Sequence, residues 1–361
     1  MLALRIAAVV LGALVVSFTI GSAVKTVVLP RARASRITRV VFRALRVAFR
    51  LVAPPSMRFE RRDRILGAYA PLGLIVLLAS WLTLVLTGFA AIFWGVEDRG
   101  VEAALELSGS SLFTLGIARP SQFSSAPLMF AEAGIGLFLL ALLITYLPSI
   151  YSAYSRREIG IAALEVRAGE PPSTREMIWR YERLGRLTEI HEVWIDWQRW
   201  FAEVEETHTS YPVLTFFRSR HDDHSWVTAA GAVLDAASIM ASSVDVPRDV
   251  EAEFCIRSGY LCLRAIADYF QIVHDPDPRP DDPISVRRDE WEDLVAELER
   301  GGVPLKPDRD RAWRDFAGWR VNYDRVLISL AALTEAPMAP WSSDRGIVPM
   351  RPPIFHRSRA R

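Results

Sequence analysis

Residues 65–96 read ILGAYAPLGLIVLLASWLTLVLTGFAAIFWGV, a stretch without a charged side chain. At about 1.5 Å per residue, a helix over this stretch is longer than the roughly 30 Å hydrocarbon core of a bilayer. Two more apolar stretches accompany it: residues 6–24 carry no charge, and residues 126–154 carry only Glu132. The sequence therefore predicts three membrane-spanning helices.

Charge separates this part of the chain from the rest. Residues 1–154 have a net charge of +8 and residues 155–361 a net charge of −7. Hydrophobic residues make up 51% of the chain, which is typical of a membrane portion joined to a water-soluble domain. No strongly basic run occurs in the second part, so a nucleic acid is not expected as a partner.

Basic residues also predict the orientation. Residues 25–64 contain 12 Lys and Arg but only two acids, Glu60 and Asp63. By the positive-inside rule this segment lies in the cytoplasm, and the loop between the second and third spans lies outside. Gly21-Ser22-Ala23 resembles a signal cleavage site, but the charge pattern favours an uncleaved span. We expect a multi-pass protein of the cell (inner) membrane with its N-terminus outside and its C-terminal domain in the cytoplasm.

Five arginines recur every three or four residues within this basic segment. They share one face of a predicted helix: Arg36, Arg39, Arg43, Arg46 and Arg50. Apolar residues occupy other faces, so we expect this helix to lie in the headgroup plane and to bind anionic lipid. A voltage sensor is the alternative, but a spanning helix would bury five arginines without an acidic partner helix.

Residues 97–125 connect the second and third spans. A short helix is predicted over residues 101–111, and Thr114-Leu115-Gly116-Ile117-Ala118 follows it. A short helix that enters from outside points the negative end of its dipole at the bilayer centre, where it favours a cation. Backbone carbonyls after the helix can then replace water around the ion, provided that the irregular chain lines water or is buried in protein.

Residues 65–154 resemble the pore-loop potassium channels, whose filter reads T-V-G-Y-G or T-L-G-F-G between a short pore helix and an inner helix. This resemblance to a bacterial two-transmembrane channel implies an all-α fold: an outer helix, a pore helix, a filter and an inner helix, here with an extra N-terminal transmembrane helix. It also implies a homotetramer with a monovalent cation such as potassium in the filter, and no other cofactor. The implied filter residues are Thr114, Leu115, Gly116, Ile117 and Ala118.

The same resemblance assigns roles to residues around the filter. Arg119 and Glu132 would lie at the pore mouth, Gly134 and Gly136 would form a gating hinge, and Pro148 would bend the inner helix. Glu132 has two interpretations. It is a functional group, as an ionisable residue in a span commonly is, or it braces the loop by pairing with Arg119 or Arg99.

Three departures from the family pattern leave a second hypothesis open. Ala118 replaces the second filter glycine, Ile117 replaces the aromatic residue, and Arg119 stands where the family usually has Asp. These changes disfavour potassium selectivity. The alternative is a non-conducting membrane anchor whose cytoplasmic domain binds a partner protein. No nucleophile motif, phosphate loop or acid–base constellation is present, so an enzyme is not expected.

The C-terminal part is predicted to be a helical bundle. The third span is expected to continue as a helix to Ala168, and further helices are predicted over residues 173–209, 226–243, 246–273, 289–300 and 311–333. Residues after Ala336 are rich in Pro and Arg and are expected to be extended or disordered. The domains are therefore residues 1–29, the N-terminal transmembrane helix; 30–64, the basic amphipathic segment; 65–154, the channel-like domain; 155–336, the helical cytoplasmic domain; and 337–361, the tail.

Three groups of side chains in this domain invite a functional interpretation. His221-Asp222-Asp223-His224, with His208 and acids upstream, contains metal-ligand residue types, but its spacing matches no established site. A solvated turn is the favoured interpretation, with a metal or pH sensor as the alternative. Trp194, Trp197 and Trp200 are expected to pack against neighbouring helices. Cys255 and Cys262 are expected to be reduced core residues.

Overall fold

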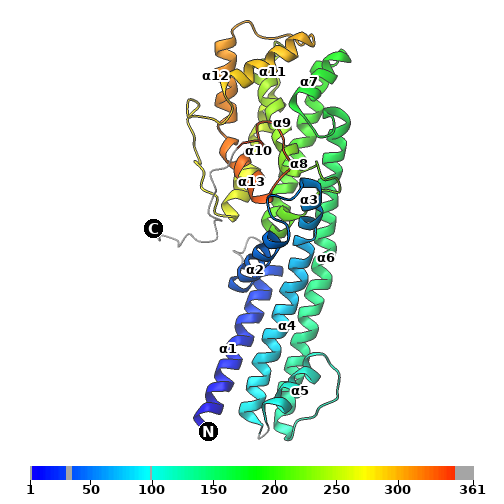
Figure 1. The fold of residues 1–361 in the computed structure, drawn as a ribbon, viewed down its shortest axis with the longest axis vertical. Coiled ribbons are helices and arrows are strands. Elements are labelled where there is room, and N and C mark those ends of the chain that lie inside the picture. The colour runs from blue at the N-terminus through cyan, green and yellow to red at the C-terminus, as the bar shows by residue number, and fades with distance from the viewer. Residues whose placement is uncertain (1, 30–34, 98–99, 346–361) are drawn as a thin grey trace. The chain divides into compact units, whose positions relative to one another are not determined.

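The computed structural model describes residues 2–29, 35–97 and 100–345, and within these ranges the chain is helical and contains no strand (Figure 1). The predicted all-helical class is therefore confirmed. The α-helices are α1 (Leu2–Val27), α2 (Arg36–Val52), α3 (Phe59–Gly67), α4 (Tyr69–Val96), α5 (Val101–Leu112), α6 (Ala126–Ala168), α7 (Thr174–Arg183), α8 (His191–Ser210), α9 (Trp226–Ser242), α10 (Val250–Tyr269), α11 (Arg288–Arg300), α12 (Arg309–Arg320) and α13 (Asp324–Thr334).

Two compact units divide the chain. The first comprises the described residues of 1–57 and 65–151, and the second those of 58–64 and 152–361. Three helical stretches are long and apolar enough to cross a membrane: Leu2–Val27, Phe59–Val96 and Phe123–Ala168. They coincide with the three predicted spans, and by length and composition they indicate a membrane protein.

Helices α1 and α4 of the first unit run side by side and pack closely (Figure 1). A Cβ added to Gly12 would clash with the carbonyl oxygen of Gly88, and one added to Gly88 would lie 2.7 Å from Val16. Small residues of this kind let two backbones approach where lipid supplies no hydrophobic drive for association. Trp81 adds a polar contact, because its Nε1 donates to the Ser22 hydroxyl over 3.1 Å.

Helix α2 folds against the start of α4. The rings of Phe42 and Phe49 both meet Tyr69 edge to face, with centroids 6.0 and 5.5 Å away. The Tyr69 hydroxyl donates to the Phe42 carbonyl oxygen over 3.1 Å. Gly73 leaves the space that the Phe42 ring fills. These contacts fix which face of α2 is turned toward the protein.

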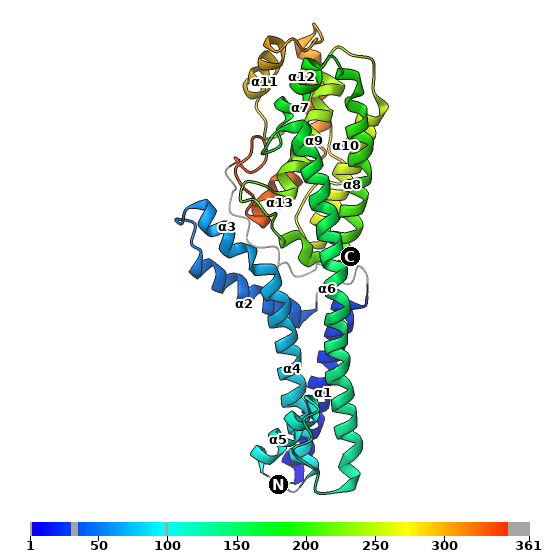
Figure 2. The ribbon, with the colours of Figure 1, turned by 90° about the vertical axis from the view of Figure 1, so that its right-hand side faces the viewer.

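The second unit is a helical bundle around one apolar core, which includes residues of α6 after its midpoint (Figure 2). Ile161, Leu164 and Ala168 belong to this core, so the expected continuation of the third span to Ala168 is confirmed. Cys255 and Cys262 are free and fully buried, as predicted.

Two predicted helices are each divided in the structure. The helix expected over residues 173–209 is interrupted between α7 and α8, because Gly185 has φ +64° and the Arg186 amide caps the Tyr181 carbonyl. The helix expected over residues 311–333 is interrupted after α12, where the Asn322 side chain donates to the carbonyls of Gly318 and Trp319. In both places the helix ends at a local capping contact, although the apolar periodicity of the sequence continues past it.

The start of the expected tail also differs from its prediction. Residues 337–345 are packed against the bundle rather than extended, because Trp341 is buried in the core. Arg345 reinforces this position by donating to Glu290 over 2.9 Å. Residues 346–361, the remainder of the predicted tail, lie outside the described residues.

Candidate functional site

The short helix α5 packs along the end of α4 (Figures 1 and 2), and its serines contact α6. Its Ser108 hydroxyl lies 2.9 Å from the carbonyl oxygen of Leu86, which is ten residues, or about 15 Å, before the end of α4. The carbonyl of Leu112, its last residue, lies against Gly136, about 15 Å after the start of α6. Leu112, the last residue of α5, therefore lies about 15 Å from the start of α6, and Ser108, one turn earlier, lies about 15 Å from the end of α4.

Glu132 is the buried acid at this junction. It has no exposed surface, and its Oε1 lies 2.5 Å from the Ser108 hydroxyl, so it connects α6 to α5. The neighbouring Ser111 hydroxyl donates to the carbonyl of Met129, also on α6, over 2.6 Å. This contact with a serine tests neither predicted role of Glu132, a functional group or a brace paired with an arginine. Arg99, one of the two arginines considered for it, lies outside the described residues.

The segment expected to be the filter begins with a helix cap. The amides of Thr114 and Leu115 donate to the carbonyls of Ser111 and Ser110, and Thr114 has φ 53°. Gly116 also has positive φ, +70°, which favours glycine. Leu115 and Ile117 are 60% and 70% exposed, so these side chains find no cover within the chain.

The loop then returns to its own helix. The amide of Ala118 donates to the Ser110 hydroxyl over 3.0 Å. Only Leu115, Gly116 and Ile117 therefore lie between Thr114 and this return contact. Beyond Arg119, which is exposed, the amide of Ser121 donates to the buried carboxylate of Glu97 over 2.8 Å.

The three residues expected to let the inner helix bend have different surroundings. Gly136 is a close-packing position, because any Cβ there would clash with the Leu112 carbonyl. Gly134 has open space around it. Pro148 lies inside α6, which is a single continuous helix from Ala126 to Ala168. One face of α6 is exposed along this length, and it carries Gly134, Leu137, Ala141, Thr145 and Pro148.

The arginine stripe of α2 lies on an exposed part of that helix. Arg36, Arg39 and Arg50 are exposed, whereas Arg43 and Arg46 are half-buried. A second exposed stripe runs beside it and is apolar, with Val40, Val47 and Leu51 between 56% and 78% exposed. Helix α2 thus presents three faces: one toward α4, one apolar and exposed, and one cationic.

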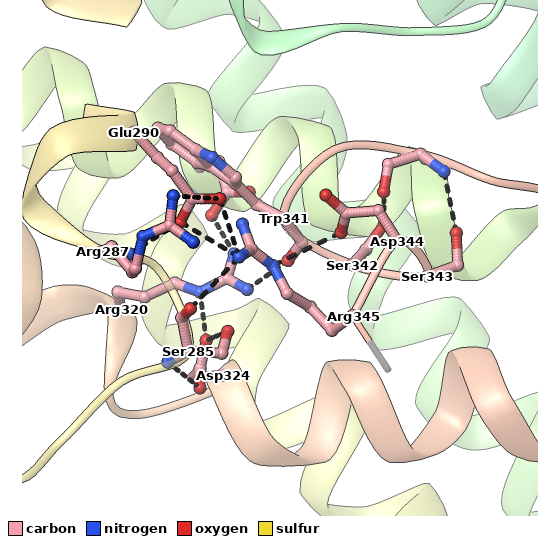
Figure 3. Close-up of polar contacts among 12 residues, drawn as sticks. Ser285, Arg287, Glu290, Arg320, Asp324, Trp341, Ser342, Ser343, Asp344 and Arg345 are labelled. Atoms are coloured by element: carbon pink, nitrogen blue, oxygen red, sulfur yellow. Dashed lines mark hydrogen bonds and ion pairs between the residues drawn. The ribbon is translucent and has the colours of Figure 1, made fainter. Parts of the chain in front are cut away.

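In the second unit, a buried arginine organises the packing of the C-terminal helices (Figure 3). Arg320 is fully buried, and it donates to Asp235 over 2.5 Å, to Asp324 over 2.7 Å and to the carbonyl of Trp341. Burial alone would lower the pKa of Arg320, but the two acids outweigh it and raise the pKa, so the guanidinium is charged. Each guanidinium nitrogen of Arg320 donates a hydrogen bond, which is typical of a structural ion-pair network.

The other side chains considered for a role in this domain lie in different surroundings. Trp194, Trp197 and Trp200 are all buried in the core, as the packing interpretation predicted. His208 is fully buried beside Arg157, whose Nη1 lies 3.3 Å from its Nε2. Burial and the nearby Arg157 charge lower the pKa of His208 well below its usual value, so it is neutral. His224 lies against Glu165 and Glu170 at the end of α6.

Sequence reasoning missed Glu97 and the serines of α5 as contributors to this site. A signal for the serines was available, since Ser108-Gly109-Ser110-Ser111 places hydroxyls at the end of an otherwise apolar helix. Comparison with known proteins adds no assignment: no protein-family model, no curated protein and no solved structure matches this chain.

Proposed function

We propose that four copies of this chain form a cation channel of the cell membrane, with α4 as the outer helix, α5 as the pore helix and α6 as the inner helix. The observation that carries the proposal is the depth of α5. Its last residue, Leu112, lies against Gly136, about 15 Å from the start of α6, which is half of a bilayer core roughly 30 Å thick.

The chemistry of lipid supports assembly around an axis. Irregular backbone at this depth is tolerated only where it is buried in protein or lines water. Residues Thr114 to Ile117 are exposed in a single chain. Four such loops around an axis would face one another, and their carbonyl oxygens would replace the water shell of a cation. The exposed face of α6, with Gly134 and Ala141 as small residues, would line the path or meet the next copy.

The proposed pore is weakly selective. Only three residues, Leu115, Gly116 and Ile117, lie between the cap at Thr114 and the return contact at Ala118, so few carbonyl rings are available. Arg119 is exposed just after this segment and would repel an approaching cation. We therefore propose a cation pathway that does not strongly distinguish potassium from sodium.

Orientation and partners belong to the same proposal. The basic segment containing α2 would face the cytoplasm and bind anionic headgroups through Arg36, Arg39 and Arg50, while its apolar stripe enters the acyl boundary. The soluble unit would be cytoplasmic and would serve assembly or regulation, because α6 continues into it without a break.

A non-conducting anchor with a partner-binding cytoplasmic domain is the alternative. It is favoured by the hydrogen bond from Ala118 to Ser110, which folds the loop onto its own helix. A loop held by its own chain needs no neighbouring copies to keep its shape.

Reconstituted full-length protein tests the proposal. We expect fourfold particles in detergent and potassium and sodium efflux from liposomes. Gly116→Ala should reduce efflux at least tenfold, because alanine disfavours φ +70° although the space around it is open. Gly21→Ala, at an open helical position in α1, is the matched control and should conduct normally. A monomeric particle without efflux would overturn the channel, and fourfold particles without efflux would favour the anchor.

A further inference from the structure

Three carboxylates surround one buried histidine in the second unit. His224 is 7% exposed. Its Nδ1 lies 2.8 Å from Glu165 Oε1, and its Nε2 lies 3.1 Å from Glu170 Oε1 and 3.4 Å from Asp223 Oδ1. Four ionisable groups therefore meet here: His224 and Glu165 are largely buried, whereas Glu170 and Asp223 are 61% and 58% exposed.

Three separate segments deliver these groups. Glu165 lies in the last turn of α6, and Glu170 follows the end of that helix, where Gly169 turns the chain with φ +84°. His224 precedes α9 and is held in a turn, since its amide donates to the His221 carbonyl over 3.1 Å. The sequence placed His224 among possible metal ligands but paired it with upstream residues 203–208. The structure replaces those partners with acids of the α6 end.

Hydrogen bonds alone do not satisfy this cluster. Glu165 Oε1 is buried and has no hydrogen-bond partner, although it lies 2.8 Å from His224 Nδ1. The short distance thus lacks the direction that a hydrogen bond requires. A buried acceptor left in this way is costly, and one imidazole can offset at most one of the three carboxylate charges.

A divalent cation would both ligate the unpaired Glu165 oxygen and offset the excess negative charge. Glu165, Glu170 and His224 each offer one ligand atom, and these three atoms lie within 4.8 Å of one another. Ligand atoms of a tetrahedral ion with bonds of about 2.0–2.2 Å lie about 3.4 Å apart. Because Glu165 faces Nδ1 and Glu170 faces Nε2, one carboxylate has to turn to the other ring nitrogen to close the site. One nitrogen with two carboxylate oxygens suits zinc and related transition metals, whereas calcium and magnesium prefer oxygen ligands alone.

We propose that Glu165, Glu170 and His224 bind a divalent transition cation such as Zn²⁺ and that the ion joins the end of α6 to the segment before α9. Asp223 adds a nearby carboxylate that can ligate the ion or accept a hydrogen bond from a water bound to it. This site is independent of the proposed channel, because metal binding is a property of the folded chain whether or not it conducts.

Titration of metal-free, full-length protein in detergent with ZnCl₂ tests the site by calorimetry. We expect one Zn²⁺ per chain, a raised melting temperature, and no comparable effect of MgCl₂. His224→Gln and Glu170→Gln should each weaken Zn²⁺ binding at least tenfold and remove the thermal shift. The Glu170 side chain is 61% exposed, so its replacement should leave folding intact even if a change at Glu165 or His224 does not.

His191→Gln is the matched control, since this histidine is exposed at the start of α8 and should leave Zn²⁺ binding unchanged. Absence of Zn²⁺ binding by the folded wild-type protein would overturn the proposal. Binding that persists at full strength in both Glu170→Gln and His224→Gln would also overturn it, because the ion would then occupy a different place.

Discussion

In the unit that contains α1, α4 and α5, helices meet where their side chains are smallest. Gly12 faces Gly88, and Gly136 faces the carbonyl of Leu112. In the bundle that contains α7 to α13, glycines face side chains instead, as Gly259 faces Leu234, and the core also holds charged groups such as the fully buried Arg320. The difference follows from the solvent. Water drives large apolar groups together, and a buried ion pair offsets its desolvation cost only where its hydrogen bonds are all made. Lipid supplies no such hydrophobic drive, so helices there associate through close approach of their backbones.

The largest effect should come from breaking the charged network of the bundle. Arg320→Met leaves Asp235 and Asp324 buried without their cation, and we expect the free energy of unfolding to fall by about 3–5 kcal/mol. Chemical unfolding of the full-length protein in detergent, followed by tryptophan fluorescence, measures this loss.

Arg288→Met is the matched control for this experiment. Arg288 also pairs with two acids, Glu292 and Asp310, but all three are exposed. Its replacement should leave unfolding almost unchanged. If the two variants lose similar stability, burial does not explain how much the Arg320 network contributes to the free energy of unfolding.

A close backbone contact of the other unit can be broken by one methyl group. Gly136→Ala pushes α6 away from the end of α5, and overpacking of this kind costs about 1–3 kcal/mol. Gly134→Ala, two residues earlier with open space around it, should keep or raise the melting temperature.

This pair also separates packing from hinge motion. If Gly134→Ala alters channel opening while the melting temperature is kept, the hinge prediction for Gly134 is supported. If both variants melt like the wild type, the contact between Leu112 and Gly136 is not a tight one.

The sequence was sufficient for features that depend on local composition. The three spans, the α2 stripe and α5 follow from uncharged length and helical spacing, and α5 was predicted within one residue of its observed end. Caps were harder to foresee. Gly185 ends α7 inside an apolar pattern that continues past it, because the stop depends on two backbone hydrogen bonds and not on the periodicity.

The candidate sites required the fold, because their members are distant in sequence. Glu132 meets Ser108, 24 residues earlier, and His224 meets Glu165, 59 residues earlier. No periodicity relates such positions. The Thr-Leu-Gly motif marks the segment predicted to be a filter, but the cap at Thr114 and the return contact at Ala118 depend on backbone groups and a serine hydroxyl of α5.

Acid should weaken the bundle through His208. The lowered pKa of this histidine means that the unfolded chain takes up a proton first as the pH falls below its ordinary value of about 6.5. Stability is therefore lost toward acid, by at most about 1.4 kcal/mol per pH unit until the folded pKa is reached.

His208→Gln should flatten this dependence. The measurement is the slope of unfolding free energy between pH 7 and pH 5, and His191→Gln, an exposed control, should retain the wild-type slope. An unchanged slope in His208→Gln would assign the acid sensitivity to other groups.

The smallest effect should appear on the cationic face of α2. Arg39 is exposed next to the apolar stripe of Val40 and Val47, so its charge can reach lipid headgroups while the stripe contacts acyl chains. Arg39→Gln in nanodiscs should weaken the preference for anionic over neutral lipid by no more than about 1 kcal/mol, and 1 M salt should abolish the difference. Native mass spectrometry of retained lipid measures it. Arg199→Gln, which removes an exposed charge from α8 of the soluble bundle, should leave lipid preference unchanged. A loss of equal size in both variants would mean that net charge attracts these lipids, and not the three-faced geometry of α2.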